Sequence, residues 1–134
     1  GKLSGFMHTD KVAPIFTQKE KKLEATWDAT LIDMIRCKHI IKAYTDFNIL
    51  ENVHERSKQL MSSISNPKIK NLRGAGLLIG FDLDSEKDRN YFKDECYNKG
   101  LLINGGGSKS IRLRPNLEVT PEEINKAVSI INTI

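Results

Sequence analysis

The sequence of 134 residues contains little that could build a metal or redox centre. Its two cysteines, Cys37 and Cys96, are far apart and form no CxxC pair, which indicates reduced thiols in a cytoplasmic protein. The three histidines, His8, His39 and His54, lack the spacing of zinc ligands, so no metal site is predicted. No Ser-His-Asp or Cys-His arrangement can be recognised, so the sequence does not indicate a hydrolase of these types.

Long apolar runs and a strong charge bias are absent as well. No segment approaches the roughly 20 apolar residues that cross a bilayer, and the N-terminus lacks the apolar core of a signal peptide, so we expect no membrane partner. The net charge is only +4, and the basic cluster at residues 19–22 contains an acid and no aromatic residue. A nucleic-acid partner is therefore not expected. The chain lacks an initiator Met, which fits a fragment of a longer protein, although an N-terminus altered for expression would give the same start.

The periodicity of the apolar residues predicts an α/β fold in which helices pack on a short mixed or antiparallel sheet. Residues 28–47 are expected to form a long helix that is buried on more than one face, as in helices that link two domains. Cap and stop signals place further helices at residues 48–66, from 84 or 85 to 100, and from 120 onward. Strands are expected at residues 75–83, 101–103 and 111–113, with a turn at 104–108.

Arg112 and Arg114 stand two residues apart on a predicted strand, so their side chains point to one face. Two neighbouring guanidinium groups repel each other unless an anion or an acid lies between them. A guanidinium also matches a carboxylate through two parallel hydrogen bonds. One interpretation is an anion site, and the other is a pair of surface arginines that pair with nearby acids. Spacing alone favours the second interpretation.

Two other segments have structural explanations. The glycine-rich loop at residues 105–110 lacks the spacing of a phosphate loop and precedes a predicted strand, so we expect a hairpin-type loop. Asp82, Asp84 and Asp88 lack the glycine and the closing glutamate of a calcium loop, and we expect a helix cap and solvent-facing acids. Thr26 precedes the long helix, where a position near the N-cap and a ligand role are equally compatible with the sequence.

Four stretches, taken together, resemble the class III aminotransferases, which are fold type I enzymes that depend on pyridoxal 5'-phosphate (PLP). Their order and spacing along the chain are those of the family, and the L-lysine 6-transaminase and 4-aminobutyrate transaminase branches are the most similar. The stretches are residues 24–27 with 31–36, 72–77 with 80–82, 98–102 with the glycines after them, and Ser110-Ile-Arg-Leu-Arg-Pro115 with 119–124.

This resemblance implies roles for three residues. Arg112 matches the arginine that binds the carboxylate of the substrate. Thr26 matches a threonine whose hydroxyl reaches the PLP phosphate across a dimer interface, which implies a homodimer with a shared active site. Lys2 stands roughly where the family has its Schiff-base lysine, a catalytic and cofactor-binding residue.

The resemblance also implies how the chain is organised. Residues 1–35 would be the tail of a large PLP-binding domain and the start of the linking helix, and residues 36–134 the C-terminal small domain. The expected function is that of an ω-aminotransferase, which moves a terminal amino group from a lysine-like donor to a 2-oxo acid such as 2-oxoglutarate. Most of its cofactor site would lie upstream, so we expect this chain alone to be inactive.

Other functions remain open at this point. A 4-aminobutyrate, ornithine or acetylornithine aminotransferase would fit the same motifs. An alternative of another class is a small non-enzymatic α/β interaction domain that shares only the architecture.

Overall fold

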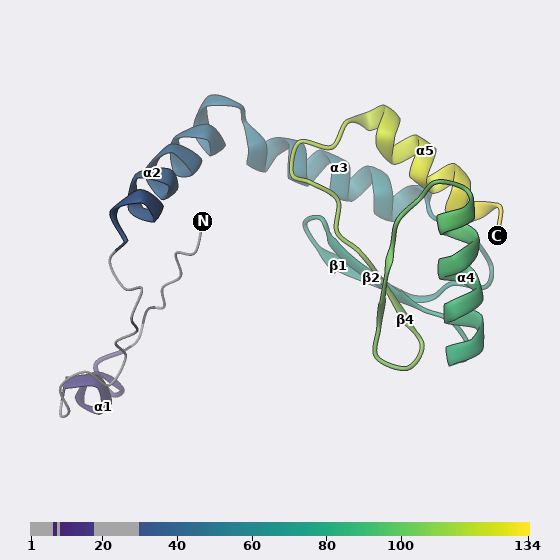
Figure 1. Cartoon of the computed structure of the whole chain (residues 1–134), viewed down its shortest axis with the longest axis horizontal. Coiled ribbons are helices and arrows are strands. Elements are labelled where there is room, and N and C mark those ends of the chain that lie inside the picture. Colours follow the sequence, from purple (N-terminus) through teal and green to yellow (C-terminus); the bar gives the residue numbers. More distant parts are fainter. Residues whose placement is uncertain (1–6, 8, 18–29) are drawn as a thin grey trace. The chain divides into compact units, whose positions relative to one another are not determined.

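A computed structural model describes Met7 and residues 9–17 and 30–134 (Figure 1). The chain divides into two compact units, residues 1–47 and 48–134. The first unit contains α1 (Ala13–Thr17) and α2 (Leu31–Asp46). Within the described residues, no helix is both long and apolar enough to cross a membrane.

Helix α2 forms where the sequence predicted the long helix, but its expected burial was wrong. None of its residues is buried, and Leu31 and Ile32 are 67% and 69% exposed. The apolar residues of α2 fall on several sides of the helix, so a single neighbour cannot cover all of them.

The second unit holds a four-stranded antiparallel sheet with the strand order β1-β2-β4-β3 and three further helices (Figure 1). The elements are α3 (Ile49–Ser63), β1 (Lys70–Ala75), β2 (Leu78–Asp82), α4 (Glu86–Asn98), β3 (Asn104–Gly106), β4 (Ser110–Leu113) and α5 (Pro121–Asn132). The prediction of helices on a short mixed or antiparallel sheet is thus confirmed, and the sheet is antiparallel throughout.

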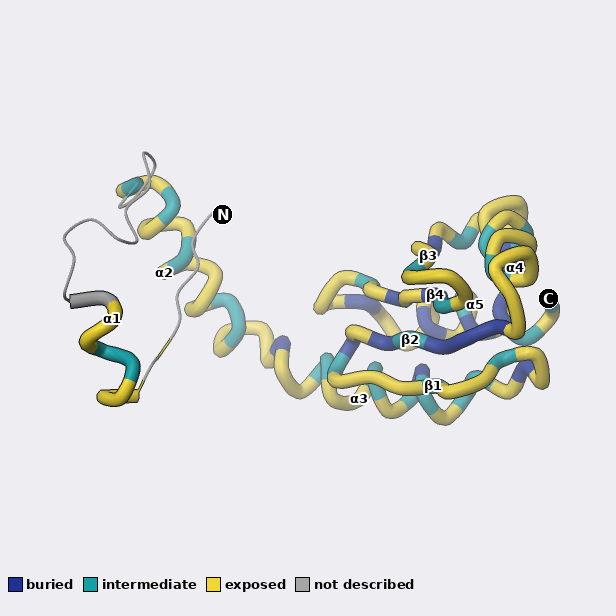
Figure 2. The backbone as a smooth tube through the Cα atoms, turned by 90° about the horizontal axis from the view of Figure 1, so that it is seen from below, coloured by how far each residue is buried: buried dark blue, intermediate teal, exposed yellow. Residues whose placement is uncertain are grey.

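The hydrophobic core lies between the sheet and helices α3, α4 and α5. We call the side of the sheet that faces this core the inner face; β2 and β4 supply its buried side chains, Ile79, Phe81, Ile111 and Leu113. The ring of Phe81 meets that of Phe92 on α4 edge to face, with the centroids 5.6 Å apart. In Figure 2, β2 is the strand with the longest buried stretch.

Residues between the inner-face side chains point to the other side, which we call the outer face, because successive side chains of a strand alternate. On β2 these residues are Gly80 and Asp82, and on β4 they are Ser110 and Arg112. Within residues 48–134, no helix or strand packs on them as α3, α4 and α5 pack on the inner face.

Three helix ends follow the predicted signals, whereas Asn48, the expected cap of α3, makes no side-chain cap hydrogen bond. Thr120 and Glu123 form a capping box at the start of α5. The hydroxyl of Ser85 accepts a hydrogen bond from the Asp88 N–H at the start of α4. Gly100 ends α4 with a φ of +84°, a conformation that suits glycine.

Three details of the prediction were wrong. Residues 101–103 do not form a strand; the strand that pairs with β4 is β3, in the segment expected to be a turn. Its glycines pair through the backbone, which needs no β-forming side chains. The expected strand at residues 75–83 is shorter in the structure, where β2 begins at Leu78. A tight turn at Gly76 (φ +55°) connects it to the preceding strand, β1. Tyr91, expected to face inward, is 58% exposed.

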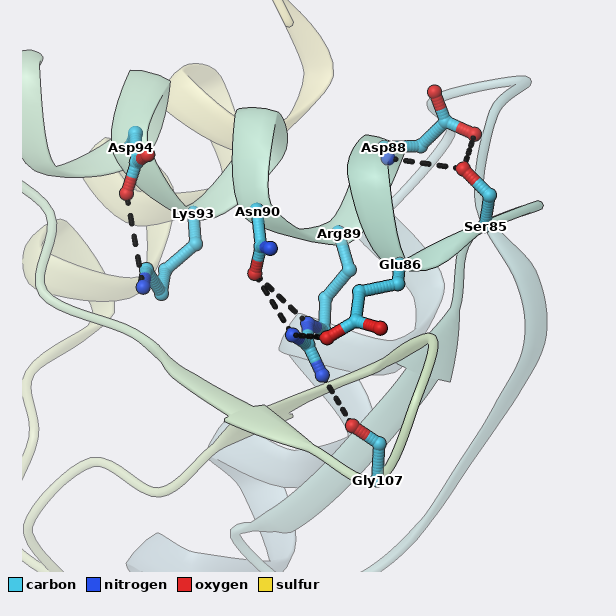
Figure 3. Close-up of polar contacts among 8 residues, drawn as sticks. All are labelled: Ser85, Glu86, Asp88, Arg89, Asn90, Lys93, Asp94 and Gly107. Carbon is cyan, nitrogen blue, oxygen red and sulfur yellow. Dashed lines mark hydrogen bonds and ion pairs between the residues drawn. The ribbon is translucent and has the colours of Figure 1, made fainter.

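The loop between β3 and β4 is held by α4 (Figure 3). The guanidinium of Arg89 donates hydrogen bonds to the carbonyl of Gly107 and, over 2.8 Å, to the side-chain oxygen of Asn90. It also forms an ion pair with Glu86 at 3.0 Å. Strands β3 and β4 therefore form a hairpin with a fixed loop, which confirms the hairpin prediction.

Candidate functional site

The candidate site is built around one row of residues that crosses the outer face. Arg112 on β4 lies opposite Gly80 on β2 and opposite Asn104 on β3. Arg73 on β1 lies opposite Gly80 from the other side. Because directly paired residues of antiparallel strands point to the same face, two arginines flank a glycine that has no side chain.

The guanidinium of Arg112 has no ion pair or hydrogen bond with any residue that the structure describes. Arg112 is exposed, and its neighbours in sequence, Ile111 and Leu113, are buried, as the alternating pattern predicted. Arg112 and Arg114 both border a cavity of about 270 Å³, with a mostly apolar lining from α5 and the segment before β3. Neither arginine pairs with a nearby described acid, so the surface-pair interpretation is not supported.

Asp82 lies two residues from this row along β2, and three donors surround it. Its carboxylate accepts hydrogen bonds from the Ser110 hydroxyl at 2.6 Å, the Asn71 amide at 3.0 Å and the Arg73 guanidinium at 3.0 Å. Only 12% of its side chain is exposed. These bonds, that from Ser110 first, then those from Asn71 and Arg73, hold the pKa of Asp82 well below its ordinary value.

The expectation that Asp82 faces solvent was wrong. Asn71 reaches Asp82 because β1 carries an extra residue between Lys70 and Arg73, and Asn71 itself takes a φ of +51°. No pattern in the sequence marks β1 as a strand, so the pairing that brings Arg73 to Asp82 could not be predicted. The available signal was the alternation of Gly80 and Asp82 with the apolar residues of β2.

The other site residues predicted from the sequence, Lys2 and Thr26, lie outside the described residues. The structure therefore places only Arg112 of the three. Among the residues in the described ranges, no group of three or more His, Cys, Asp or Glu side chains could hold a metal ion.

Comparison with known proteins identifies the family. The model of the family "Aminotransferase class-III" matches residues 2–134, and the chain therefore belongs to the class III aminotransferases. The L-lysine-epsilon aminotransferase of Mycobacterium tuberculosis is 24% identical over 130 residues, which are 92% of this chain and 29% of that protein. The acetylornithine aminotransferase of Bacillus cereus is 30% identical over 115 residues, which are 82% of this chain and 29% of that protein.

Solved structures show the same fold. The lysine aminotransferase from M. tuberculosis in the internal aldimine form gives a TM-score of 0.79 at 23% identity, over 92% of this chain and 30% of that one. The ornithine delta-aminotransferase of Plasmodium falciparum gives 0.75 at 19% identity, over 86% and 32% of the two chains. The chain thus spans about three tenths of the length of the relatives that it matches.

Proposed function

We propose that this chain is the C-terminal part of an ω-aminotransferase and that Arg112 binds the carboxylate of its substrate. The observation that carries the proposal is the state of Arg112, which is exposed on a fixed strand and has no partner among the described residues. The matching arginine across Gly80, Arg73, is paired with Asp82. An anion from outside the described part of the chain is the natural partner of the free guanidinium.

A guanidinium on a strand would fix the direction in which a substrate binds. Arg112 lies on β4 between two hydrogen-bonded neighbours, so its backbone is held from both sides. A planar guanidinium donates two parallel hydrogen bonds to a carboxylate that lies in its plane. The far end of the substrate is then presented at a set distance, which is how an enzyme brings a terminal amine to its reacting partner.

The proposed enzyme uses PLP, which supplies the group that carries the amino nitrogen between donor and acceptor. Lys2 and Thr26 are the residues of this chain that we propose to contact it, Lys2 as the Schiff-base lysine and Thr26 at the phosphate of a neighbouring subunit. Both lie outside the described residues, so no observation of this structure tests their fit.

The proposed substrates are supported by the names of the relatives. Relatives named as lysine, acetylornithine and ornithine aminotransferases match this chain, so we propose a donor with a terminal amine and a distant carboxylate. The proposed acceptor is a 2-oxo acid such as 2-oxoglutarate. A lysine-like donor is our first choice, with 4-aminobutyrate, ornithine or acetylornithine as the alternatives. Since the chain belongs to an aminotransferase family, this proposal is favoured over a non-enzymatic interaction domain.

The proposed assembly is a cytoplasmic homodimer with a shared active site. We place residues 1–35 in the large domain and residues 36–134 in the small domain. The exposed apolar side chains of α2, among them Leu31, Ile35 and Ile41, support packing of this helix against other parts of the enzyme.

The proposal is tested by changing Arg112→Lys in the full-length enzyme. Lysine keeps the charge but loses the second parallel hydrogen bond to a carboxylate. Losing one charge-assisted bond costs about 1.5–3 kcal/mol, roughly a 10- to 150-fold fall in kcat/KM for the donor. Steady-state kinetics would measure this fall, and absorbance titration with PLP should show unchanged cofactor binding.

The matched control is Arg114→Lys, which makes the same exchange just beyond the end of β4. We expect a much smaller effect from this variant, because Arg114 lies outside the row formed with Gly80 and Asn104. Normal donor kinetics in the Arg112→Lys enzyme would refute the assignment. Transaminase turnover by the 134-residue chain alone, reconstituted with PLP, would refute its proposed status as one part of the enzyme.

A further inference from the structure

Asp82 lies within reach of two arginines on the outer face. It follows Gly80 by two residues on β2, and Gly80 is paired with Arg73 on one side and Arg112 on the other. Asp82 is thus the diagonal neighbour of Arg112, and Arg73 reaches it from the opposite strand. Diagonal neighbours in an antiparallel sheet have their Cβ atoms about 7–8 Å apart, which a long side chain such as arginine can bridge.

The structure shows which arginine Asp82 binds. Arg73 donates to the carboxylate at 3.0 Å, whereas Arg112 has no partner among the described residues. Arg73 is also held from its other side, since it donates to the backbone carbonyl of Asn71 at 2.8 Å. Gly80 adds no side chain between the two arginines, so Asp82 could reach either of them.

The arginine with which Asp82 pairs would determine whether Arg112 is free to bind a substrate. A carboxylate paired with Arg112 would fill the guanidinium edge that a substrate needs, and its negative charge would repel the carboxylate of the substrate. Ser110 and Asn71 donate to Asp82 as well, so its oxygens already have three donors without Arg112. With its carboxylate satisfied in this way, Asp82 gains little from turning to Arg112.

We propose that Arg73 is a positioning residue, which holds Asp82 in an ion pair on the far side of Gly80 and so leaves Arg112 free for the substrate. Arg73 does not contact the substrate and acts only through Asp82. This inference rests on the proposed function of Arg112 and adds a second residue to that site.

The test removes Arg73 from the full-length enzyme as Arg73→Gln. Asp82 then loses its cation and turns to Arg112, and we expect the KM for L-lysine to rise about tenfold with a smaller change in kcat. The probe without a carboxylate is 1,5-diaminopentane, which is L-lysine lacking that group, and its KM should stay within about twofold. The matched control is Lys70→Gln. It also removes a positive charge from β1, but that charge is paired with Asp84 and not with Asp82.

The decisive variant adds Asp82→Asn to Arg73→Gln. An asparagine has no charge to offer Arg112, so the KM for L-lysine should return to within about threefold of the parent enzyme. A purely structural role of Arg73 predicts the opposite, since a second change in the same cluster would leave the defect in place or enlarge it. A thermal unfolding curve for each variant shows how much of the protein is folded.

The outcomes separate this inference from the proposed function. If Arg112→Lys impairs use of L-lysine but Arg73→Gln does not, or if the double variant stays impaired, the inference is wrong and the role of Arg112 stands. An equal rise in KM for L-lysine and 1,5-diaminopentane in Arg73→Gln would also overturn it. The proposed function itself fails if Arg112→Lys leaves the kinetics unchanged with L-lysine and also with 4-aminobutyrate and L-ornithine as donors.

Discussion

The two faces of the sheet are built from alternate residues of the same strands, yet they obey different physical requirements. On the inner face, Ile79, Phe81 and Ile111 are at most 1% exposed and pack against three helices. On the outer face, the corresponding positions carry a glycine, an acid and arginines. The difference indicates that the inner face determines stability, while the outer face is free to serve binding.

The two faces also differ in the charges that they carry. The inner face buries only apolar side chains from β2 and β4, because an unpaired polar group there would lose its hydration. The outer face surrounds the Asp82 carboxylate with donors and leaves the Arg112 guanidinium without an acceptor among the described residues. Changes on the inner face should therefore be measured mainly by unfolding, and changes beside Arg112 mainly by substrate use.

The largest effect should come from Phe81→Ala on the inner face. Phe81 is fully buried and contacts Phe92, so the change leaves a cavity that costs about 3–5 kcal/mol of unfolding free energy. Urea unfolding of the 134-residue chain would measure the loss. The matched control is Tyr91→Ala, an exposed aromatic residue on α4 that should cost less than about 0.5 kcal/mol. Equal losses for the two would contradict the inner-face assignment.

The next effect is expected from Gly74→Ala on β1, which lies opposite Ile79. A Cβ atom at this position would lie 2.8 Å from the Ile79 side chain and 2.8 Å from the Leu78 carbonyl oxygen. Since the oxygen belongs to the backbone, relief requires the strands to move, at a cost of about 1–3 kcal/mol. The same unfolding measurement applies. Unchanged stability would show that the β1–β2 pairing is looser than described.

A smaller, pH-dependent effect should come from Asp82 on the outer face. Its pKa is lowered in the folded chain, so it stabilises the fold above its ordinary value of 3.8, and this contribution disappears as the pH falls below that value. Asp82→Asn should flatten the acid limb of stability against pH. The control Asp84→Asn, an acid whose side chain is 67% exposed, should leave that limb steep. Identical curves for both variants would exclude a special role for Asp82.

The smallest effect on stability is expected for Gly80→Ala, the outer-face counterpart of Gly74→Ala. A Cβ atom here would meet only the Ile111 carbonyl oxygen at 3.4 Å, and stability should change by less than about 0.5 kcal/mol. The methyl group would instead occupy the space between Arg73 and Arg112. In the full-length enzyme we expect the KM for L-lysine to rise several-fold, and an unchanged KM would show that this space is not used.

Much of the inner face could be predicted from the sequence. The apolar alternation at residues 111–113 and the cap signals at Ser85 and Thr120 depend on neighbours within a few positions, and all three are found as predicted. The prediction failed for β1 and β3. Their residues, such as Asn71 and Gly105, carry no strand preference, and only pairing with β2 and β4 makes them strands.

For the site as well, the sequence predicted one part and missed another. Arg112 could be singled out by its motif, and its exposed position on a strand agrees with the alternation of its neighbours. The environment of Asp82 could not be foreseen, because its donors come from Asn71, Arg73 and Ser110 on two other strands. Contacts between distant segments depend on register, and register is not visible in a single strand.

The hydrogen bond from Arg89 to the loop after β3 affects how the edges of the sheet can pair with other strands. Strand β3 is one edge and has only three residues, and α4 ties down the loop next to it through Gly107. The other edge, β1, carries a bulge at Asn71 and two cationic side chains, Lys70 and Arg73. Short, bulged and charged edges resist pairing with a further strand. The sheets of two copies of this chain are thus protected against joining edge to edge into aggregates.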